Sequence, residues 1–390
     1  MALGKVFLLG GKRTPFGAFG GSLKDIKPVD LAVFSSKMAL ESAGVSPQDI
    51  DHTLMANVIP STSDTLYGGR HLGLKLGVPT EKGGYNINRL CGSGIEAILS
   101  AKRLIQSGEA NLVLVSGTEN MSMVPHLTYG ARFGTKYGPL KSKDLLLDSL
   151  TDEFCNTPMG ITAENLAQKY EISRQDCEDY SFNSHKRAND AYEKGYLKDE
   201  VISVELKNRT FNKDEHLRGD ISIEDMKKLK PSFQQNGVVT PATASGIVDG
   251  AASVLIASEA YINKAGLKPL CEVVDGAVVG VDPTLMGIGP CPAIKSILNK
   301  HNLKVDNIDL YEINEAFASQ LLACKKELSI TDEKLNIFGG SIAVGHPLGA
   351  TGVRISLTLA RQLHIFNAKM GIASACIGGG QGIALLLKSC

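Results

Sequence analysis

The sequence has no tryptophan, no excess of charge of one sign and no long hydrophobic run. Lysine and arginine together number 41, as do aspartate and glutamate, so the formal net charge is zero. This neutral balance argues against a nucleic-acid partner, which a basic surface would bind. No apolar run approaches the ~20 residues that cross a bilayer, so we also expect no membrane partner.

Paired cysteines are lacking as well. The eight cysteines are scattered, with no Cys-x-x-Cys pair and no cysteine–histidine cluster at zinc spacing. We therefore expect free thiols in a reducing compartment and no metal site. The N-terminus has no basic region and cleavage site of a targeting peptide, and the C-terminus has no peroxisomal or prenylation signal. These observations predict a cytosolic protein.

The chain of 390 residues is long enough for two or three domains. Predicted strands and helices alternate along its first part. Apolar runs at 3–10, 50–59 and 111–117 predict strands, and the periodicity of 22–44 and 93–108 predicts helices between them. This alternation is typical of an α/β domain with a buried, partly parallel sheet. A second α/β series starts at Cys271 and ends with two strands around the glycines at 378–380.

The middle of the chain has a different character. From Met121 to about Lys230 it is more polar, and Ser173–Asp176 and Gly195 are typical of the two ends of a charged helix. We expect an inserted, mostly helical subdomain here. The flanking parts resemble each other, since 91–117 and 345–375 both contain a glycine-rich turn, a helix and a further strand, which suggests a duplication.

Cys91 is the first candidate reactive group. It follows a short extended run, precedes Gly92 and Gly94, and lies where a helix begins. The positive end of a helix dipole favours the thiolate form of a cysteine, and so a nucleophile. A lone cysteine is equally often a small buried hydrophobic residue, and this turn alone leaves both interpretations open.

Three other residues have unusual surroundings. His346 lies in a loop with five glycines, and Pro347 holds it out of the helical region. Cys376 precedes three glycines, whose backbone N–H groups can form either an oxyanion hole or a tight turn. Asn314 opens a predicted helix, where N-capping alone would explain it. Residues 92–97 match a relaxed dinucleotide pattern, but no acidic partner follows at the expected distance.

In combination, these motifs resemble the thiolase family, in the group of acetyl-CoA C-acetyltransferases and 3-ketoacyl-CoA thiolases. The matching stretches occur in family order over nearly the whole chain: 88–94, 119–122, 159–165, 244–246, 314–318, 345–347 and 376–382. The resemblance implies a duplicated five-layer αβαβα core with an inserted, mostly helical loop domain. The N-terminal half would be 1–120 plus 246–268, the loop domain 121–245 and the C-terminal half 269–390.

The resemblance also implies a reversible ping-pong reaction that converts acyl-CoA plus acetyl-CoA into 3-ketoacyl-CoA plus CoA. Cys91 would carry the acyl group as a thioester, His346 would activate it, and Cys376 would act as acid and base at the α-carbon. Asn314 would hold a catalytic water, and the N–H groups of Cys91 and Gly378 would bind the oxyanion. Coenzyme A is then a substrate or product, and no tightly bound cofactor is expected.

Further site residues follow from the same match. The CoA site would be lined by Arg218, Phe233, Ala244, Ser245 and Phe317, and the acyl pocket by Met159 and Met286. The chain would form a homodimer or a homotetramer, with residues 121–145 as the tetramer loop. Pro158 stands where biosynthetic thiolases have histidine, and in this it is similar to broad-chain degradative thiolases.

Two other functions remain open. One is a condensing enzyme similar to HMG-CoA synthase, which pairs one cysteine with different acid and base partners. The other is a non-catalytic acyl-CoA carrier of the same fold, whose mark would be the loss of Cys91 or His346. Neither residue is lost here.

Overall fold

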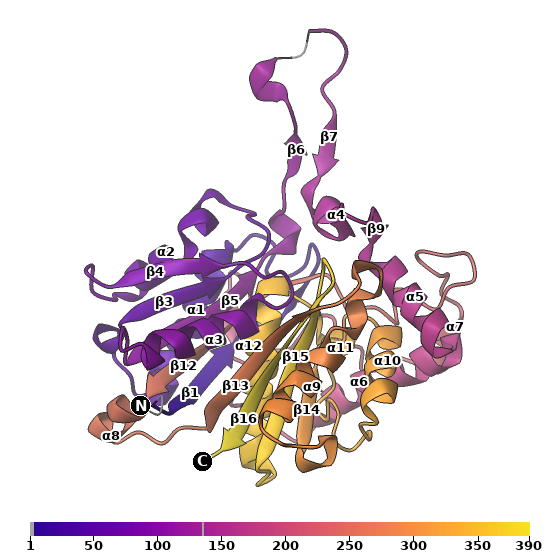
Figure 1. The fold of residues 1–390 in the computed structure, drawn as a ribbon. Coiled ribbons are helices and arrows are strands. Elements are labelled where there is room, and N and C mark those ends of the chain that lie inside the picture. The colour runs from indigo at the N-terminus through magenta and orange to yellow at the C-terminus, as the bar shows by residue number, and fades with distance from the viewer. Residues whose placement is uncertain (1–3, 135) are drawn as a thin grey trace.

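A mixed ten-stranded sheet forms the centre of the computed structural model, which describes residues 4–134 and 136–390 (Figure 1). The strand order is β14-β15-β16-β13-β1-β12-β5-β3-β4, and β2 pairs with β12. The first group of strands is β1 (Val6–Arg13), β2 (Gly17–Ala18), β3 (His52–Ala56), β4 (Gly83–Ile87), β5 (Leu112–Glu119) and β12 (Val248–Ser258). The second group is β13 (Cys271–Gly280), β14 (Leu310–Ile313), β15 (Met370–Ile377) and β16 (Gln381–Ser389).

The sheet is partly parallel, as the sequence predicted. β3 runs parallel to β4 and β5, and β14 runs parallel to β15, while β1, β12, β13 and β16 pair in antiparallel fashion. The two groups of strands meet where β1 pairs with β13 through two residue pairs, Phe7 with Glu272 and Leu8 with Cys271. The predicted strand at 3–10 is therefore β1, although Leu3 lies outside the described residues.

Helices cover the two groups of strands and also separate them. The outer helices are α1 (Pro28–Ala43), α2 (Gly68–Leu76) and α8 (Glu259–Ala265) on the first group, and α9 (Pro290–Lys300) with α10 (Ala318–Leu328) on the second. The helices α3 (Ser93–Gln106) and α12 (Leu348–Ile365) pack against each other and touch strands of both groups. The layers therefore run α, β, α, β, α, which confirms the predicted five-layer core.

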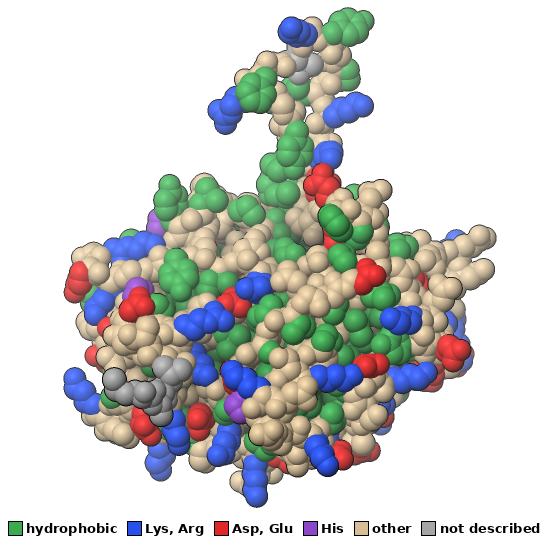
Figure 2. Space-filling model, in the orientation of Figure 1, with side chains coloured by type: hydrophobic (Ala, Val, Ile, Leu, Met, Phe, Trp, Pro, Cys, Tyr) green, Lys and Arg blue, Asp and Glu red, His purple; other side chains and the backbone are tan. Residues whose placement is uncertain are grey.

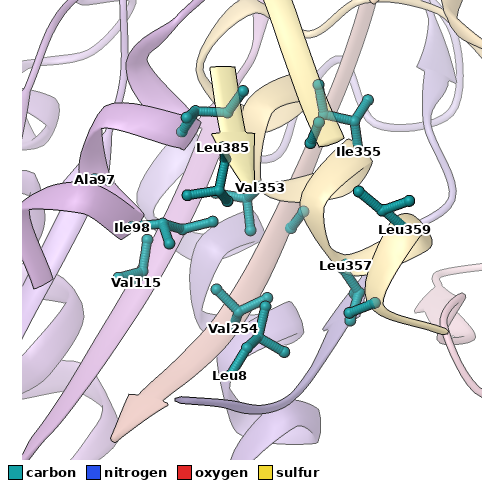
Figure 3. Close-up of a cluster of buried hydrophobic side chains, with 14 of the residues drawn as sticks. Leu8, Ala97, Ile98, Val115, Val254, Val353, Ile355, Leu357, Leu359 and Leu385 are labelled. Carbon is teal, nitrogen blue, oxygen red and sulfur yellow. The ribbon is translucent and has the colours of Figure 1, made fainter. Parts of the chain in front are cut away.

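Apolar side chains fill the space around the central helices. Figure 3 shows Ala97 and Ile98 of α3 near Val353 of α12, with Val115 of β5 and Leu385 of β16 around them. All five side chains are buried. Burying a valine, leucine or isoleucine side chain contributes about 1.5–3 kcal/mol, so this shared core holds the two groups of strands together.

The two central helices touch through their backbones. A Cβ atom on Gly94 would lie 2.4 Å from the backbone nitrogen of Val353, and one on Gly352 would lie 2.4 Å from that of Ile95. Only glycine permits this approach at the N-terminal ends of α3 and α12. The crossing places the segments that precede the two helices, which contain Cys91 and His346, side by side.

Gly94→Ala should lower the free energy of unfolding by about 1–3 kcal/mol, because the added methyl group has backbone rather than a movable side chain in its way. Denaturant unfolding followed by circular dichroism measures this change. Gly10→Ala is a matched control, since a Cβ there meets no atom within 4 Å. Equal unfolding midpoints for the two variants would contradict the proposed close contact.

Helices are the longest regular elements of the long segment between β5 and β12, as the sequence predicted. Its helices are α4 (Leu145–Ser149), α5 (Met159–Tyr170), α6 (Arg174–Glu193) and α7 (Ile223–Lys227). The predicted helix start at Ser173 is confirmed by a capping box with Asp176. The segment also contains three short hairpins: β6–β7 (His126–Thr128, Ser142–Asp144), β8–β9 (Thr151–Asp152, Thr157–Pro158) and β10–β11 (Val204–Leu206, Arg209–Phe211).

The β6–β7 hairpin projects from the body of the molecule (Figure 1). Apolar side chains lie along it (Figure 2), and Phe133 and Tyr137 near its tip are 91% and 99% exposed. Residue 135, inside the predicted tetramer loop, lies outside the described residues. No helix in the described part of the chain is long and apolar enough to cross a membrane.

Candidate active site

Cys91 lies in a tight turn between β4 and α3. Leu90, just before it, has a φ of 47°, a left-handed conformation that is uncommon for a residue with a side chain. Ser93 holds this turn, since its Oγ accepts a hydrogen bond from the N–H of Arg89 at 2.8 Å and donates one to the carbonyl of Leu90 at 2.6 Å. Such strain is commonly found at functional sites, where the surrounding structure maintains it.

The Cys91 thiol is half-buried, and burial raises its pKa to about 11. Backbone N–H groups of Gly378 and of Cys91 itself contact the sulfur and act in the opposite direction. Contrary to the expectation that the helix terminus favours the thiolate, the resting thiol is protonated at neutral pH, because desolvation outweighs these backbone contacts. A nucleophilic role for this thiol requires a base.

Cys376 is the last residue but one of β15, and the glycine turn follows before β16. The side chain of Cys376 is fully buried. It forms an apolar cluster with Met286 and Ala316, and Met159 and Phe317 pack against this cluster. Burial and the neighbouring Cys91 sulfur both raise the pKa of Cys376 well above its usual value. The Cys91 sulfur is thus close enough to act on Cys376, although the two residues are 285 positions apart in the sequence.

Asn314 follows β14 and lies outside the helix that it was expected to open. Helix α10 begins at Ala318, and Phe317 occupies its N-cap position. The capping interpretation of Asn314 is therefore wrong. Its side chain is fully buried, and its Nδ2 lies 3.3 Å from Nε2 of His346.

His346 lies between Gly345, which has a φ of 98°, and Pro347, just before α12. Burial and the charge of Arg354 lower its pKa to about 3, so the imidazole is neutral at pH 7. Nδ1 lies 2.6 Å from Oγ1 of Thr351. Among the described residues, no hydrogen bond joins His346 to Cys91, and Nε2 is in contact with Asn314.

A cavity of about 330 Å³ opens beside these groups. Six of the site residues predicted from the sequence line this cavity: Met159, Phe233, Ala244, Ser245, Phe317 and His346. Leu348 connects the cavity to Cys91, because it lines the cavity and shares an apolar cluster with the half-buried Cys91. The lining is mostly apolar, which suits a flexible chain with few charges.

Several lining residues were not predicted: Met121, Leu147, Leu150, Thr151 and Ile247. Met121 lies in the matching stretch 119–122, which pointed to this region but not to its role as a lining residue, whereas the other four lie in segments without a regular pattern. Met286 was expected in the acyl pocket; it lies beside Cys376 and Met159 and does not line the cavity.

Arg218 does not reach this cavity either. It lines a second cavity of about 420 Å³ together with His185, His216 and Asp220. Pro241 and Ala242 line the second cavity, while Ala244 and Ser245 line the first, so one short loop separates the two. Within residues 4–134 and 136–390, no group of three His, Cys, Asp or Glu side chains could hold a metal ion.

Two family descriptions cover this chain: "Thiolase, N-terminal domain" matches residues 6–260, and "Thiolase, C-terminal domain" matches residues 267–389. The chain belongs to the thiolase family. The mouse mitochondrial 3-ketoacyl-CoA thiolase is 47% identical over 98% of each chain. A beta-ketothiolase of Cupriavidus necator is 41% identical over 98% of this chain and 99% of its own.

A solved thiolase structure agrees with the fold. The human mitochondrial 3-ketoacyl-CoA thiolase superposes with a TM-score of 0.98 at 46% identity, covering 100% of both chains. A second structure of that human thiolase is a complex with CoA, with the same TM-score and identity, covering 100% of this chain and 98% of the human one. The resemblance found in the sequence motifs is thus confirmed.

The expected cytosolic location of this thiolase is contradicted by the same comparison. The mouse and human relatives carry "mitochondrial" in their names. The expectation depended on the absence of a recognisable targeting segment, and such an absence does not determine the compartment in which a protein works.

Proposed function

We propose that this thiolase transfers acyl groups between CoA thioesters through a thioester on Cys91, converting acyl-CoA plus acetyl-CoA into 3-ketoacyl-CoA plus CoA and back. The observation that carries the proposal is the convergence of two thiols, one neutral imidazole and two backbone N–H groups beside one apolar cavity. The names of the relatives agree with this reaction and do not favour a synthase-like enzyme or a carrier.

In the first half-reaction, Nε2 of His346 takes the proton of the Cys91 thiol. The sulfur attacks the carbonyl carbon of an acyl-CoA, and the bond between that carbon and the CoA sulfur breaks. The departing CoA sulfur receives the proton from His346. The N–H groups of Cys91 and Gly378 donate to the oxyanion, which in a buried site stabilises the transition state strongly. A base is required because the pKa of Cys91 is raised to about 11.

In the second half-reaction, Cys376 removes a proton from the methyl carbon of acetyl-CoA. That carbon attacks the thioester on Cys91, so a C–C bond forms and the S–C bond breaks. Cys376 acts in this step as its thiolate, and the proton that it gains passes to the released sulfur of Cys91, which restores the resting thiol. A water held by Asn314 would stabilise the enolate oxygen, because Nε2 of His346 has returned its proton to CoA in the first half-reaction. Acylation of Cys91 turns its ionisable sulfur into a neutral thioester, so no charge on that sulfur can oppose ionisation of Cys376, and the thiolate of Cys376 forms more readily.

The two cavities suggest how CoA lies. The uncharged pantetheine arm and the acyl chain fit the apolar cavity lined by Phe233, Ala244, Ser245 and Phe317. The phosphates fit the second cavity, where Arg218 supplies a guanidinium group. Met159 and Met286, which pack beside Cys376, would then shape the end that holds the acyl group.

We also propose a role for each domain of the chain. Residues 121–245 act as the loop domain that covers CoA, with the halves at 1–120 plus 246–268 and at 269–390 forming the core. The exposed apolar side chains of the β6–β7 hairpin suit contact with other copies, so residues 121–145 would join dimers into a tetramer.

Mixing the protein with labelled acetyl-CoA in the absence of a second substrate tests the reaction. We expect one equivalent of CoA to be released per active site and one acetyl group to stay on the peptide that contains Cys91. Adding free CoA should then regenerate acetyl-CoA and remove the label. CoA release without any labelled peptide would exclude the acyl-cysteine mechanism.

A further inference from the structure

Behind His346 and Asn314 lies a continuous chain of buried hydrogen bonds. Nη2 of Arg354 lies 2.9 Å from Oγ of Ser341, and this Oγ lies 2.6 Å from Oδ1 of Asn314. Beyond the contact between Asn314 and His346, Nδ1 of the histidine reaches Thr351, whose Oγ1 lies 3.1 Å from the carbonyl of Pro347.

The donor and acceptor groups of these side chains determine which way each hydrogen bond in the series points. Arginine only donates, so Ser341 accepts from Arg354 and has its hydroxyl proton left for Oδ1 of Asn314. The Nδ2 group of Asn314 therefore faces His346, and because an amide nitrogen also only donates, Nε2 of His346 must accept. The imidazole proton is then on Nδ1 and is donated to Thr351, which passes its own proton to the carbonyl of Pro347.

We propose that Thr351 is a positioning residue that holds His346 in the tautomer with Nε2 free to accept a proton. The inference rests on the proposed function of His346 as the base for Cys91. Thr351 has no accessible surface, so water cannot take over its role as acceptor. It lies on the first turn of α12, directly after the histidine loop, so the rigid helix fixes the ring as well as its proton.

Without the Thr351 hydroxyl, Nδ1–H loses its acceptor, while the alternative tautomer loses only the weaker contact with Asn314. The population with the proton on Nε2 therefore rises, and that form cannot accept the proton of Cys91. Removing a group that orients a catalytic residue typically costs 10–100-fold in activity, so we expect a decrease of about 10–100-fold in the rate of enzyme acylation.

The experiment compares Thr351→Val, Thr351→Ser and Thr358→Val in the full-length protein. Thr351→Val should slow acylation by acetyl-CoA about 10–100-fold with KM changed less than about 2-fold, and Thr351→Ser should restore the rate to within about 3-fold of wild type. Thr358→Val removes another buried hydroxyl of α12, bonded to Glu200 at 3.0 Å, and should lower stability while leaving acylation unchanged. Thr351→Ala, which adds no bulk, replaces Thr351→Val if that variant does not fold.

A second readout separates this inference from the proposed function. Nitrogen-15 chemical shifts of labelled His346 report which ring nitrogen carries the proton, whether or not the protein is a thiolase. Wild type should show the proton on Nδ1, and Thr351→Val should shift the signal toward the Nε2 form. An unchanged tautomer and acylation rate in an active Thr351→Val protein would overturn the role of Thr351. Absence of acylation in wild type, with the tautomer as expected, would instead overturn the proposed function.

Discussion

Cys91→Ser should lower kcat/KM for thiolysis of acetoacetyl-CoA by about 10³-fold or more, the largest effect that we expect from any single substitution. Serine fills the same space, so the turn held by Ser93 and the cavity should be preserved. Its hydroxyl is a far weaker acid than a thiol, and the neutral His346, whose pKa is near 3, is too weak a base to activate it. Steady-state kinetics with CoA and acetoacetyl-CoA measure the change.

The matched control is Cys390→Ser. This cysteine is exposed at the C-terminal end of the chain, so its replacement should leave kcat/KM within the error of the assay. Equal rates for wild type and Cys91→Ser would rule out the acyl-cysteine mechanism. A similar loss in both variants would indicate general damage by serine substitution instead of loss of the nucleophile.

Cys376→Ala should separate the two half-reactions. The acetyl group should still transfer from acetyl-CoA to Cys91, because that step uses His346 and the two N–H groups. Formation of acetoacetyl-CoA should fall by about 10²–10⁴-fold, the usual contribution of a positioned acid or base. Alanine leaves only a small void beside Met286 and Ala316, so the fold should be retained.

Two measurements on one sample give this result: single-turnover labelling of the protein, and steady-state production of acetoacetyl-CoA. We expect wild type to perform both, and Cys91→Ser to perform neither. If Cys376→Ala lost labelling and product formation to the same extent, the second thiol would belong to the first step, and the assignment of separate roles would be wrong.

The sequence was informative where backbone geometry is dictated by a few residues. Glycines and a proline around His346, and glycines after Cys376, indicated loops that present side chains, and both loops lie at the candidate site. The alternating apolar runs predicted the central strands within a few residues, because a buried strand needs an unbroken hydrophobic sequence.

What the sequence could not supply depends on contacts between distant residues. The raised pKa of Cys91 comes from burial, and the side chains packed around it include Val58, Leu146 and Leu348, which are distant in the sequence, so no local pattern records it. The placement of Arg218 in a separate cavity follows from the path of the 241–246 loop, which contains no regular element. The apolar lining from Leu147 and Leu150 likewise has no local signature, because its function depends only on what it faces.

The backbone contact between Gly94 and Gly352 has a consequence for the synthesis of the protein. Cys91 is synthesised early, and His346 emerges from the ribosome some 255 residues later. In the proposed mechanism, Cys91 has neither its base nor the Gly378 N–H group until α12 docks on α3. We therefore expect a nascent or truncated chain to carry an ordinary cysteine that does not react with acyl-CoA, so that the proposed nucleophile becomes reactive only when folding is complete.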